Sequence, residues 1–129
     1  MKTVLFSATA IILSGCASAP QIYTAQDATL RRGGSIQLFP MTQDPLGGAP
    51  RLVAALAIRG FDVREGAGQN NATHSLRLTY SVGANHATGS CTLAHRTTGK
   101  IEVSVVMNSI RTAAGAANTC ADAILAAAK

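Results

Sequence analysis

The fold of this chain is decided by one alternating stretch near its middle, His74-Ser75-Leu76-Arg77-Leu78-Thr79-Tyr80-Ser81-Val82. Large side chains alternate with small or charged ones along the whole stretch, which is the two-residue period of a β-strand with one buried face. The pattern therefore predicts a strand over residues 74–82. One face is expected to carry His74, Leu76, Leu78, Tyr80 and Val82, and the other Ser75, Arg77, Thr79 and Ser81.

A hairpin and a closing helix are predicted after this strand. Residues 91–96 form the first arm, residues 97–100 the turn and residues 101–107 the second arm. Residues 112–129 are rich in alanine, and their apolar positions recur at helical spacing, so this helix should lay an apolar stripe on the sheet. The second arm is expected to place on one face Ile101, Val103, Val105 and Met107.

A strand, a helix and another strand are predicted before the central stretch. Residues 35–41 alternate, residues 51–59 carry an apolar stripe at helical spacing, and residues 61–65 alternate again. Gly60 suits the left-handed position after a helix, and Phe61 can pack back on the last turn. The order β-α-β-β-β-β-α predicts an α+β protein. Its architecture is a two-layer sandwich, with a mixed or antiparallel sheet of four to five strands carrying two helices on one face.

The N-terminus has the pattern of a secretory signal. Lys2 precedes an apolar run, Val4 to Leu13, that is too short to span a bilayer. The run ends in Leu13-Ser14-Gly15-Cys16, which resembles the lipobox of bacterial lipoproteins at every position. This resemblance implies cleavage before Cys16, a diacylglycerol on its sulfur and an acyl chain, such as palmitate, on its amino group. The alternatives are an ordinary export signal and an uncleaved anchor.

The resemblance also sets the expected location and the division of the chain. Ala17 after the cysteine favours the outer membrane in such lipoproteins, so the domain is expected in the bacterial cell envelope, facing the periplasm. Residues 1–15 are interpreted as the signal peptide, residues 16–33 as the lipidated cysteine with a flexible tether, and residues 34–129 as one α/β domain. The alternative for the tether is a short strand near Ile22 and Tyr23 that packs on the domain.

The composition offers little for catalysis. The chain has 6 Asp and Glu residues and 3 histidines, and Cys91-x-x-x-His95 is the one close Cys/His pair. Structural zinc usually uses two such pairs. His74 and His86 lie elsewhere, and neither a serine-hydrolase elbow nor a phosphate-binding loop is present in the sequence. We therefore predict that the protein is not an enzyme and has no catalytic residues, no metal and no cofactor besides the lipid on Cys16.

The basic excess is small. The formal net charge of +5 falls to +4 once Lys2 leaves with the signal. Scattered cations without interleaved aromatic residues predict no nucleic-acid binding, and suit an anionic lipid surface or an acidic partner. Arg51 and Arg59 lie on the helix side opposite the apolar stripe, which makes them candidate partner-facing residues. A solvated face is the alternative.

Half of the chain resembles a broader group of proteins. Residues 32–40, a helix that ends in Arg59-Gly60-Phe61 and the Leu-x-Leu-x-Tyr strand at residues 76–80 resemble small α/β-sandwich lipoproteins of the bacterial envelope. Among these are accessory lipoproteins of lipopolysaccharide assembly, curli secretion, transport, type IV secretion and conjugation. The resemblance implies a membrane-anchored, non-enzymatic accessory or structural component of a multi-protein envelope assembly. Its partners would be the membrane, through the lipid, and other envelope proteins.

A binding protein is the alternative function. In that case a small ligand or lipid would lie between sheet and helix, where small side chains leave room. The candidate small residues are Ala54, Ala55, Ala117 and Ala121.

A disulfide between Cys91 and Cys120 is the last prediction. With Cys16 modified, two cysteines remain in an oxidising compartment, which is the usual setting for a bridge. Cys91 shares a strand face with Leu93, and Cys120 lies on the apolar stripe of the closing helix. Two separate buried thiols are the alternative.

Overall fold

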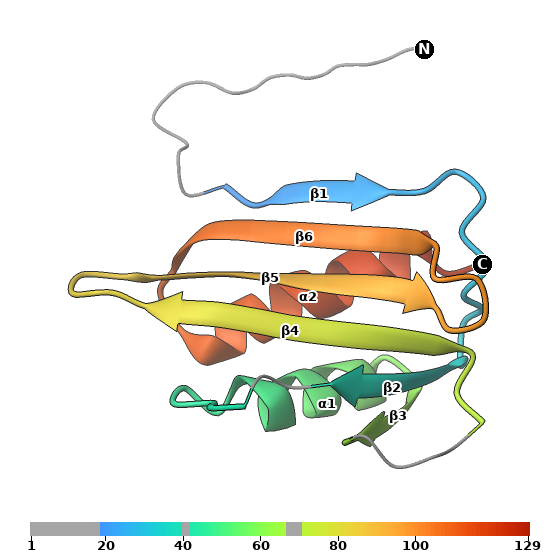
Figure 1. The fold of residues 1–129 in the computed structure, drawn as a ribbon, viewed down its shortest axis with the longest axis horizontal. Coiled ribbons are helices and arrows are strands. Elements are labelled where there is room, and N and C mark those ends of the chain that lie inside the picture. The colour runs from blue at the N-terminus through green and yellow to red at the C-terminus, as the bar shows by residue number, and fades with distance from the viewer. Residues whose placement is uncertain (1–18, 40–41, 67–70) are drawn as a thin grey trace.

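The computed structural model describes residues 19–39, 42–66 and 71–129 of the 129-residue chain (Figure 1). Cys16, with the predicted signal peptide and lipobox, lies outside the described residues. The elements are, in chain order, β1 (Gln21–Thr24), β2 (Ser35–Phe39), α1 (Gly48–Ile58), β3 (Asp62–Glu65), β4 (His74–Val82), β5 (Ala87–His95), β6 (Ile101–Ile110) and α2 (Ala113–Ala127).

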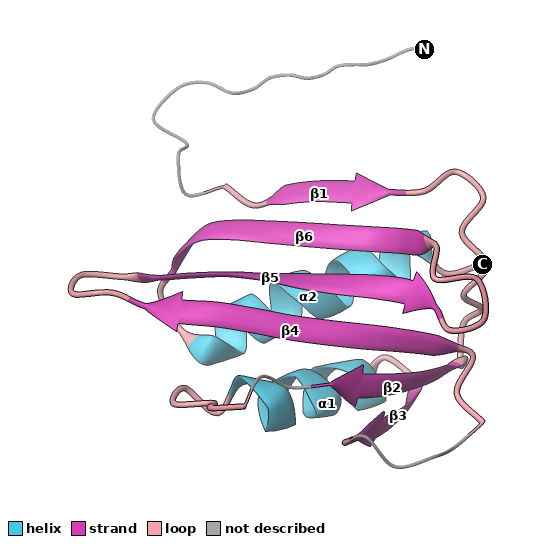
Figure 2. Cartoon of the chain, in the orientation of Figure 1, coloured by secondary structure: helices cyan, strands magenta, loops and turns pink. Residues whose placement is uncertain are grey.

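The architecture is a two-layer α+β sandwich, as predicted. The six strands form one sheet in the order β1-β6-β5-β4-β2-β3, and both helices lie side by side against one face of it (Figures 1 and 2). The sheet is mixed, because β2 pairs parallel with β3 and β4 while the other neighbours are antiparallel. The predicted sheet of four to five strands has one or two strands fewer than the observed sheet. No helix in the described part of the chain is long and apolar enough to cross a membrane.

The additional strand is β1, and it lies in the segment predicted to be a flexible tether. It pairs antiparallel with β6, with Gln21 opposite Val106 and Thr24 opposite Val103. The chain after it also packs on the domain, where it buries Ala25, Ala28 and Leu30. The alternative of a strand near Ile22 and Tyr23 is therefore the one observed. The physical reason is that β6 would otherwise present an open row of backbone N–H and C=O groups.

The parallel unit β2-α1-β3 forms one half of the core. Ile36 and Leu38 of β2 face Leu52 and Leu56 of α1, and all four are buried. Helix α1 ends as predicted: Gly60 takes the left-handed conformation at φ 94°, and the N–H groups of Gly60 and Phe61 close the last turn on Ala57 and Leu56. Phe61 is buried against this helix end.

A β-bulge in β6 changes which side chains reach the core. Leu93 lies opposite Val103, but Ala94 lies opposite Ile101, so Glu102 is an extra residue on β6. Glu102 is 1% exposed and Ile101 is 46% exposed. The predicted inward position of Ile101 is thus wrong, because the bulge turns Ile101 out and Glu102 in. Val103, Val105 and Met107 are buried as predicted.

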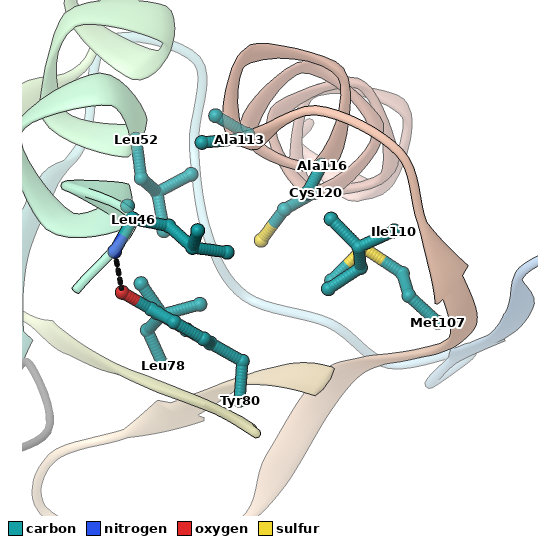
Figure 3. A pocket seen from close by; sticks show the side chains of 11 residues that line it. Leu46, Leu52, Leu78, Tyr80, Met107, Ile110, Ala113, Ala116 and Cys120 are labelled. Atoms are coloured by element: carbon teal, nitrogen blue, oxygen red, sulfur yellow. Dashed lines mark hydrogen bonds between the residues drawn. The ribbon is translucent and has the colours of Figure 1, made fainter. Parts of the chain in front are cut away.

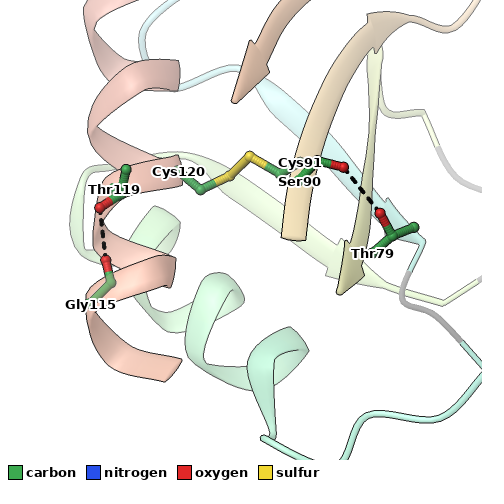
Figure 4. The surroundings of a disulfide bond; sticks show 6 residues. All are labelled: Thr79, Ser90, Cys91, Gly115, Thr119 and Cys120. Carbon is green, nitrogen blue, oxygen red and sulfur yellow. Dashed lines mark hydrogen bonds between the residues drawn. A yellow bond between two sulfur atoms is a disulfide. The ribbon is translucent and has the colours of Figure 1, made fainter. Parts of the chain in front are cut away.

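Helix α2 closes the second half of the core. Its apolar stripe contains Ala117, Cys120, Ala121 and Ile124, all buried as predicted. Thr112 caps the helix by accepting a hydrogen bond from the Gly115 N–H at 2.9 Å. The predicted disulfide is present: Cys120 is bonded to Cys91 of β5, with Cα atoms 6.5 Å apart (Figure 4). The bridge therefore ties α2 to the middle of the sheet.

Candidate functional site

The face of the sheet opposite the helices carries a largely polar surface. No helix of the described chain packs on this outer face (Figure 2). Thr79 and Ser90 share a hydrogen bond across β4 and β5, with 3.1 Å between their hydroxyl oxygens (Figure 4). The exposed residues of this face include Arg77, Thr79, Thr88, Val106 and Asn108. Such a surface offers hydrogen bonds and little apolar area.

The two edges of the sheet differ in character. All residues of β1 are exposed, and Ile22 and Tyr23 are 52% and 55% exposed. The strand carries no charged side chain, so nothing on it discourages pairing with another strand. At the other edge β3 carries Asp62, Arg64 and Glu65, and charges of this kind protect an edge. Strand β1 is therefore the edge better suited to accept a strand from a partner.

The space between the sheet and the helices is small. An apolar cavity of about 20 Å³ lies between the start of α1, the end of β4 and the start of α2 (Figure 3). Small-molecule sites usually have about 300 Å³ or more, and a cavity of this size matches one water molecule. Of the four alanines expected to leave room, Ala117 lines the cavity, and Ala54 is exposed to solvent.

Arg59, one of the two candidate partner-facing residues, contacts the neighbouring helix of its own chain. Its guanidinium binds Asp122 of α2 at 2.8 Å and donates to the Ala55 carbonyl of its own helix at 2.8 Å. Because α1 and α2 lie side by side, the helix side that carries Ala55 and Arg59 faces α2, and Ala55 is buried. The sequence pattern missed this contact because helical periodicity does not show where a second helix lies. Arg51 is exposed and donates to the carbonyls of Leu46 and Gly47.

A buried polar cluster lies where β4 and β6 meet the segment that follows β1. The Glu102 carboxylate accepts hydrogen bonds from the Thr29 N–H at 2.8 Å, the Thr29 hydroxyl at 2.5 Å and the Leu30 N–H at 3.1 Å. His74 Nε2 lies 3.0 Å from the same carboxylate. His74 Nδ1 lies 2.7 Å from the Thr73 hydroxyl. His74 and Glu102 are 2% and 1% exposed, so the pair has almost no contact with solvent.

The electrostatics of this cluster fit a structural role. Burial raises the pKa of Glu102, but the hydrogen bonds from Thr29, the charge of His74 and the Leu30 N–H outweigh it and hold the pKa below its usual range. Burial lowers the pKa of His74, and the neighbouring Glu102 only partly opposes this. At neutral pH the lowered pKa leaves His74 uncharged, so its Nε2 can donate to the Glu102 carboxylate, and the charge of His74 acts on Glu102 only at lower pH. The pair holds the segment after β1 on the sheet.

Asp44 occupies the start of α1. Its carboxylate accepts from the N–H groups of Gly48 and Ala49 at 2.8 and 2.9 Å, and from the Tyr80 hydroxyl. Burial raises the pKa of Asp44, but these hydrogen bonds and the charge of Arg51 outweigh it and lower the pKa. The chain's own carboxylate thus fills this helix N-terminus.

The other two histidines have surroundings different from those of His74. His95 contacts His74 edge to face, with ring centres 5.2 Å apart, and its Nδ1 accepts from the Thr97 N–H. His86 lies in the β4–β5 turn and is exposed. Within residues 19–39, 42–66 and 71–129, no three His, Cys, Asp or Glu side chains gather in a way that could hold a metal ion.

The comparison with known proteins gives structural relatives only. No protein-family model and no curated protein matches the sequence. Among solved structures, the chain is similar to the PelC dodecamer from Paraburkholderia phytofirmans, at 15% identity and a TM-score of 0.55 over 86% of this chain and 99% of that one. A variant of that protein matches at 16% identity, with a TM-score of 0.55 over 84% and 99% of the two chains.

A third similar structure is TolB from Acinetobacter baumannii. The identity is 15% and the TM-score 0.61, over 84% of this chain and 30% of TolB. The chain thus corresponds to less than a third of that protein. At these identities the likeness establishes the two-layer α+β fold that the three proteins share.

Proposed function

We propose that this protein is a membrane-anchored lipoprotein of the bacterial envelope, lipidated on Cys16. In this proposal it acts without catalysis, as an accessory or structural component of a multi-protein assembly of the secretion, conjugation or transport type. The observation that carries the proposal is the uncovered outer face of the sheet, bordered by the uncharged edge strand β1. A face and an edge of this kind suit docking to another protein.

Two further observations support docking over ligand capture. The cavity between the layers holds about 20 Å³, too little for a lipid or metabolite without movement of the helices. Two polar side chains buried in the domain, His74 and Glu102, have hydrogen-bond partners within the chain. The similar PelC structure is a dodecamer, so this fold is compatible with assembly into large complexes.

The proposal is tested by cross-linking the protein in native membranes. A specific complex larger than the monomer is expected, and it should be lost when Cys16→Ser releases the protein from the membrane. A monomer that carries a tightly bound small molecule would contradict docking and favour the ligand-binding alternative. A Cys16→Ser variant that is still cleaved and membrane-bound would contradict the lipid anchor.

A further inference from the structure

Several exposed cationic side chains of this domain gather at one end. Segment 25–34, the β5–β6 turn and Lys129 lie together at one end of the sheet, while β1 begins at the other end (Figure 1). This end, called the basic end below, carries exposed cationic side chains and, among the described residues, the exposed carboxylates Asp27 and Asp62. The cations are Arg31, Arg32, Arg96, Lys100 and Lys129.

Backbone contacts hold these cations close to one another. The Arg32 N–H donates to the Lys129 carbonyl at 3.0 Å, and the Lys129 N–H donates to the Leu30 carbonyl at 2.9 Å. Lys100 pairs with Asp27, and the Lys129 ammonium lies 3.4 Å from the Gln26 carbonyl. The Arg96 N–H donates to the Thr73 carbonyl, next to the His74 cluster.

The carboxylates at this end are fewer than its cations. Asp27 and Asp62 are exposed, and Glu102 is buried against Thr29 and Leu30. The exposed cations of the basic end therefore outnumber the exposed carboxylates that the described chain places beside them. Cations that look scattered in the sequence are therefore gathered by the fold into a surface with a positive potential.

We propose that the basic end binds an acidic surface of another envelope protein, which rests on the proposed docking function. A second copy of this chain does not supply such a surface. Its exposed carboxylates are few, and Asp62 and Asp122 already lie near Arg64 and Arg59. The partner must therefore bring its own carboxylates, and complementary charge would set its orientation and association rate.

The position of the anchor favours a protein over the lipid surface as the occupant. Four residues separate Cys16 from Gln21, so the two Cα atoms are at most about 18 Å apart in a fully extended chain. Gln21 lies opposite Val106, and the basic end is about 20 Å further along β6. A lipid on Cys16 would therefore attach nearer the end where β1 begins than the basic end, which leaves the basic end available to a protein.

The binding test uses the full-length protein in phosphatidylcholine vesicles and poly-L-glutamate as the acidic probe. One variant combines Arg31→Gln, Arg32→Gln and Arg96→Gln, and the matched control combines Arg64→Gln, Arg77→Gln and Arg111→Gln. The first is expected to weaken binding about tenfold and to reduce its salt dependence. The control should change binding by less than about twofold. Equal weakening by both variants, or no binding by the wild type, would overturn the proposal.

A second measurement separates a protein partner from an anionic membrane. Lys129 is labelled with a water-soluble amine reagent in phosphatidylcholine and in phosphatidylglycerol vesicles, and equal labelling is expected. Protection by phosphatidylglycerol would overturn the proposal in favour of lipid. In native membranes, loss of the cross-linked complex in the basic-end variant alone supports the proposal. A complex that persists in that variant would contradict the basic end as the docking site, but it would remain consistent with the proposed docking function.

Discussion

At the residue scale, Glu102 has the most constrained surroundings of the carboxylates. It is fully buried, and its two oxygens accept from Thr29, Leu30 and His74. Thr29 and Leu30 lie more than seventy positions away from Glu102 in the sequence, so the carboxylate holds the N-terminal segment on the sheet. Nothing in the local pattern of residues 101–107 indicates this role, because the bulge that turns Glu102 inward is a property of the pairing with β5.

Replacing Glu102 with glutamine should destabilise the domain. An amide keeps the size of the side chain but is uncharged and has one oxygen in place of two. If that oxygen keeps the Thr29 and Leu30 N–H groups, the NH₂ group replaces the oxygen that accepts from the Thr29 hydroxyl, and the charge that strengthens these hydrogen bonds is lost. We expect a loss of about 1–3 kcal/mol in the free energy of unfolding, measured by urea denaturation. Glu65→Gln on the exposed strand β3 is the control and should change stability by less than about 0.5 kcal/mol. Equal effects of the two substitutions would show that the buried hydrogen bonds contribute nothing.

The His74–Glu102 pair also predicts how stability depends on pH. The pKa of His74 is lowered in the folded state, so the unfolded chain binds the proton first, and stability falls as the pH drops below about 6.5. The pKa of Glu102 is also lowered, so its contribution is present above about 4.3 and is lost as the pH falls further. Protonation of His74 and protonation of Glu102 therefore both lower the stability of the folded protein at acid pH.

The measurement is urea denaturation at pH 7.5 and at pH 5.5. His74→Gln keeps a donor toward Glu102 but cannot titrate, so it should lose less stability between the two pH values than the wild type does. His86→Gln, at an exposed turn, should behave like the wild type. An unchanged pH dependence in His74→Gln would contradict the assignment.

At the element scale, the strands differ in how much their own sequence specifies them. Strand β4 and the β5–β6 hairpin were predictable because long alternation with one buried face has few other solutions. The end of α1 at Gly60 was predictable from local chemistry, because glycine readily takes the left-handed conformation that follows a helix. Strand β1 was not specified, because it is short, exposed on both sides and held only by its pairing with β6. The contact between Arg59 and α2 likewise depends on where the helices settle.

The close approach of β4 and β5 leads to a prediction at Gly89. It lies opposite Tyr80, and a Cβ atom there would be 2.7 Å from the Tyr80 Cβ and 2.8 Å from the Thr79 carbonyl oxygen. Gly89→Ala should force the strands apart and cost about 1–3 kcal/mol in thermal or urea unfolding. Thr88→Val, on the exposed face one residue earlier, is the control and should be nearly neutral. A stable Gly89→Ala variant would mean that the strands can separate without losing their packing.

At the scale of the whole molecule, one thin core joins the sheet to both helices. The α2 side of this core is largely alanine, and each alanine buries little apolar area. The core is continuous from Ile36 on β2 to Val105 on β6, yet α2 depends on small contacts along one stripe. A covalent link between this helix and the sheet therefore has more effect here than it would in a domain with large side chains in its second layer.

The Cys91–Cys120 disulfide supplies that link, and its removal gives the last prediction. Its two cysteines are 29 positions apart. In the chain-entropy model, closing a loop of this length raises the free energy of the unfolded chain by about 3.6 kcal/mol. The double variant Cys91→Ala with Cys120→Ala should therefore lose about 2–4 kcal/mol of unfolding free energy in urea. The unfolding free energy of wild-type protein treated with a reductant should approach that of the double variant, because both lack the cross-link. It need not be identical, because the reduced protein keeps its two sulfur atoms. Thiol labelling of the denatured, unreduced Cys16→Ser chain should find no free thiol. Two labelled thiols in that chain, or equal stability of oxidised and reduced protein, would show that α2 is held by its packing alone.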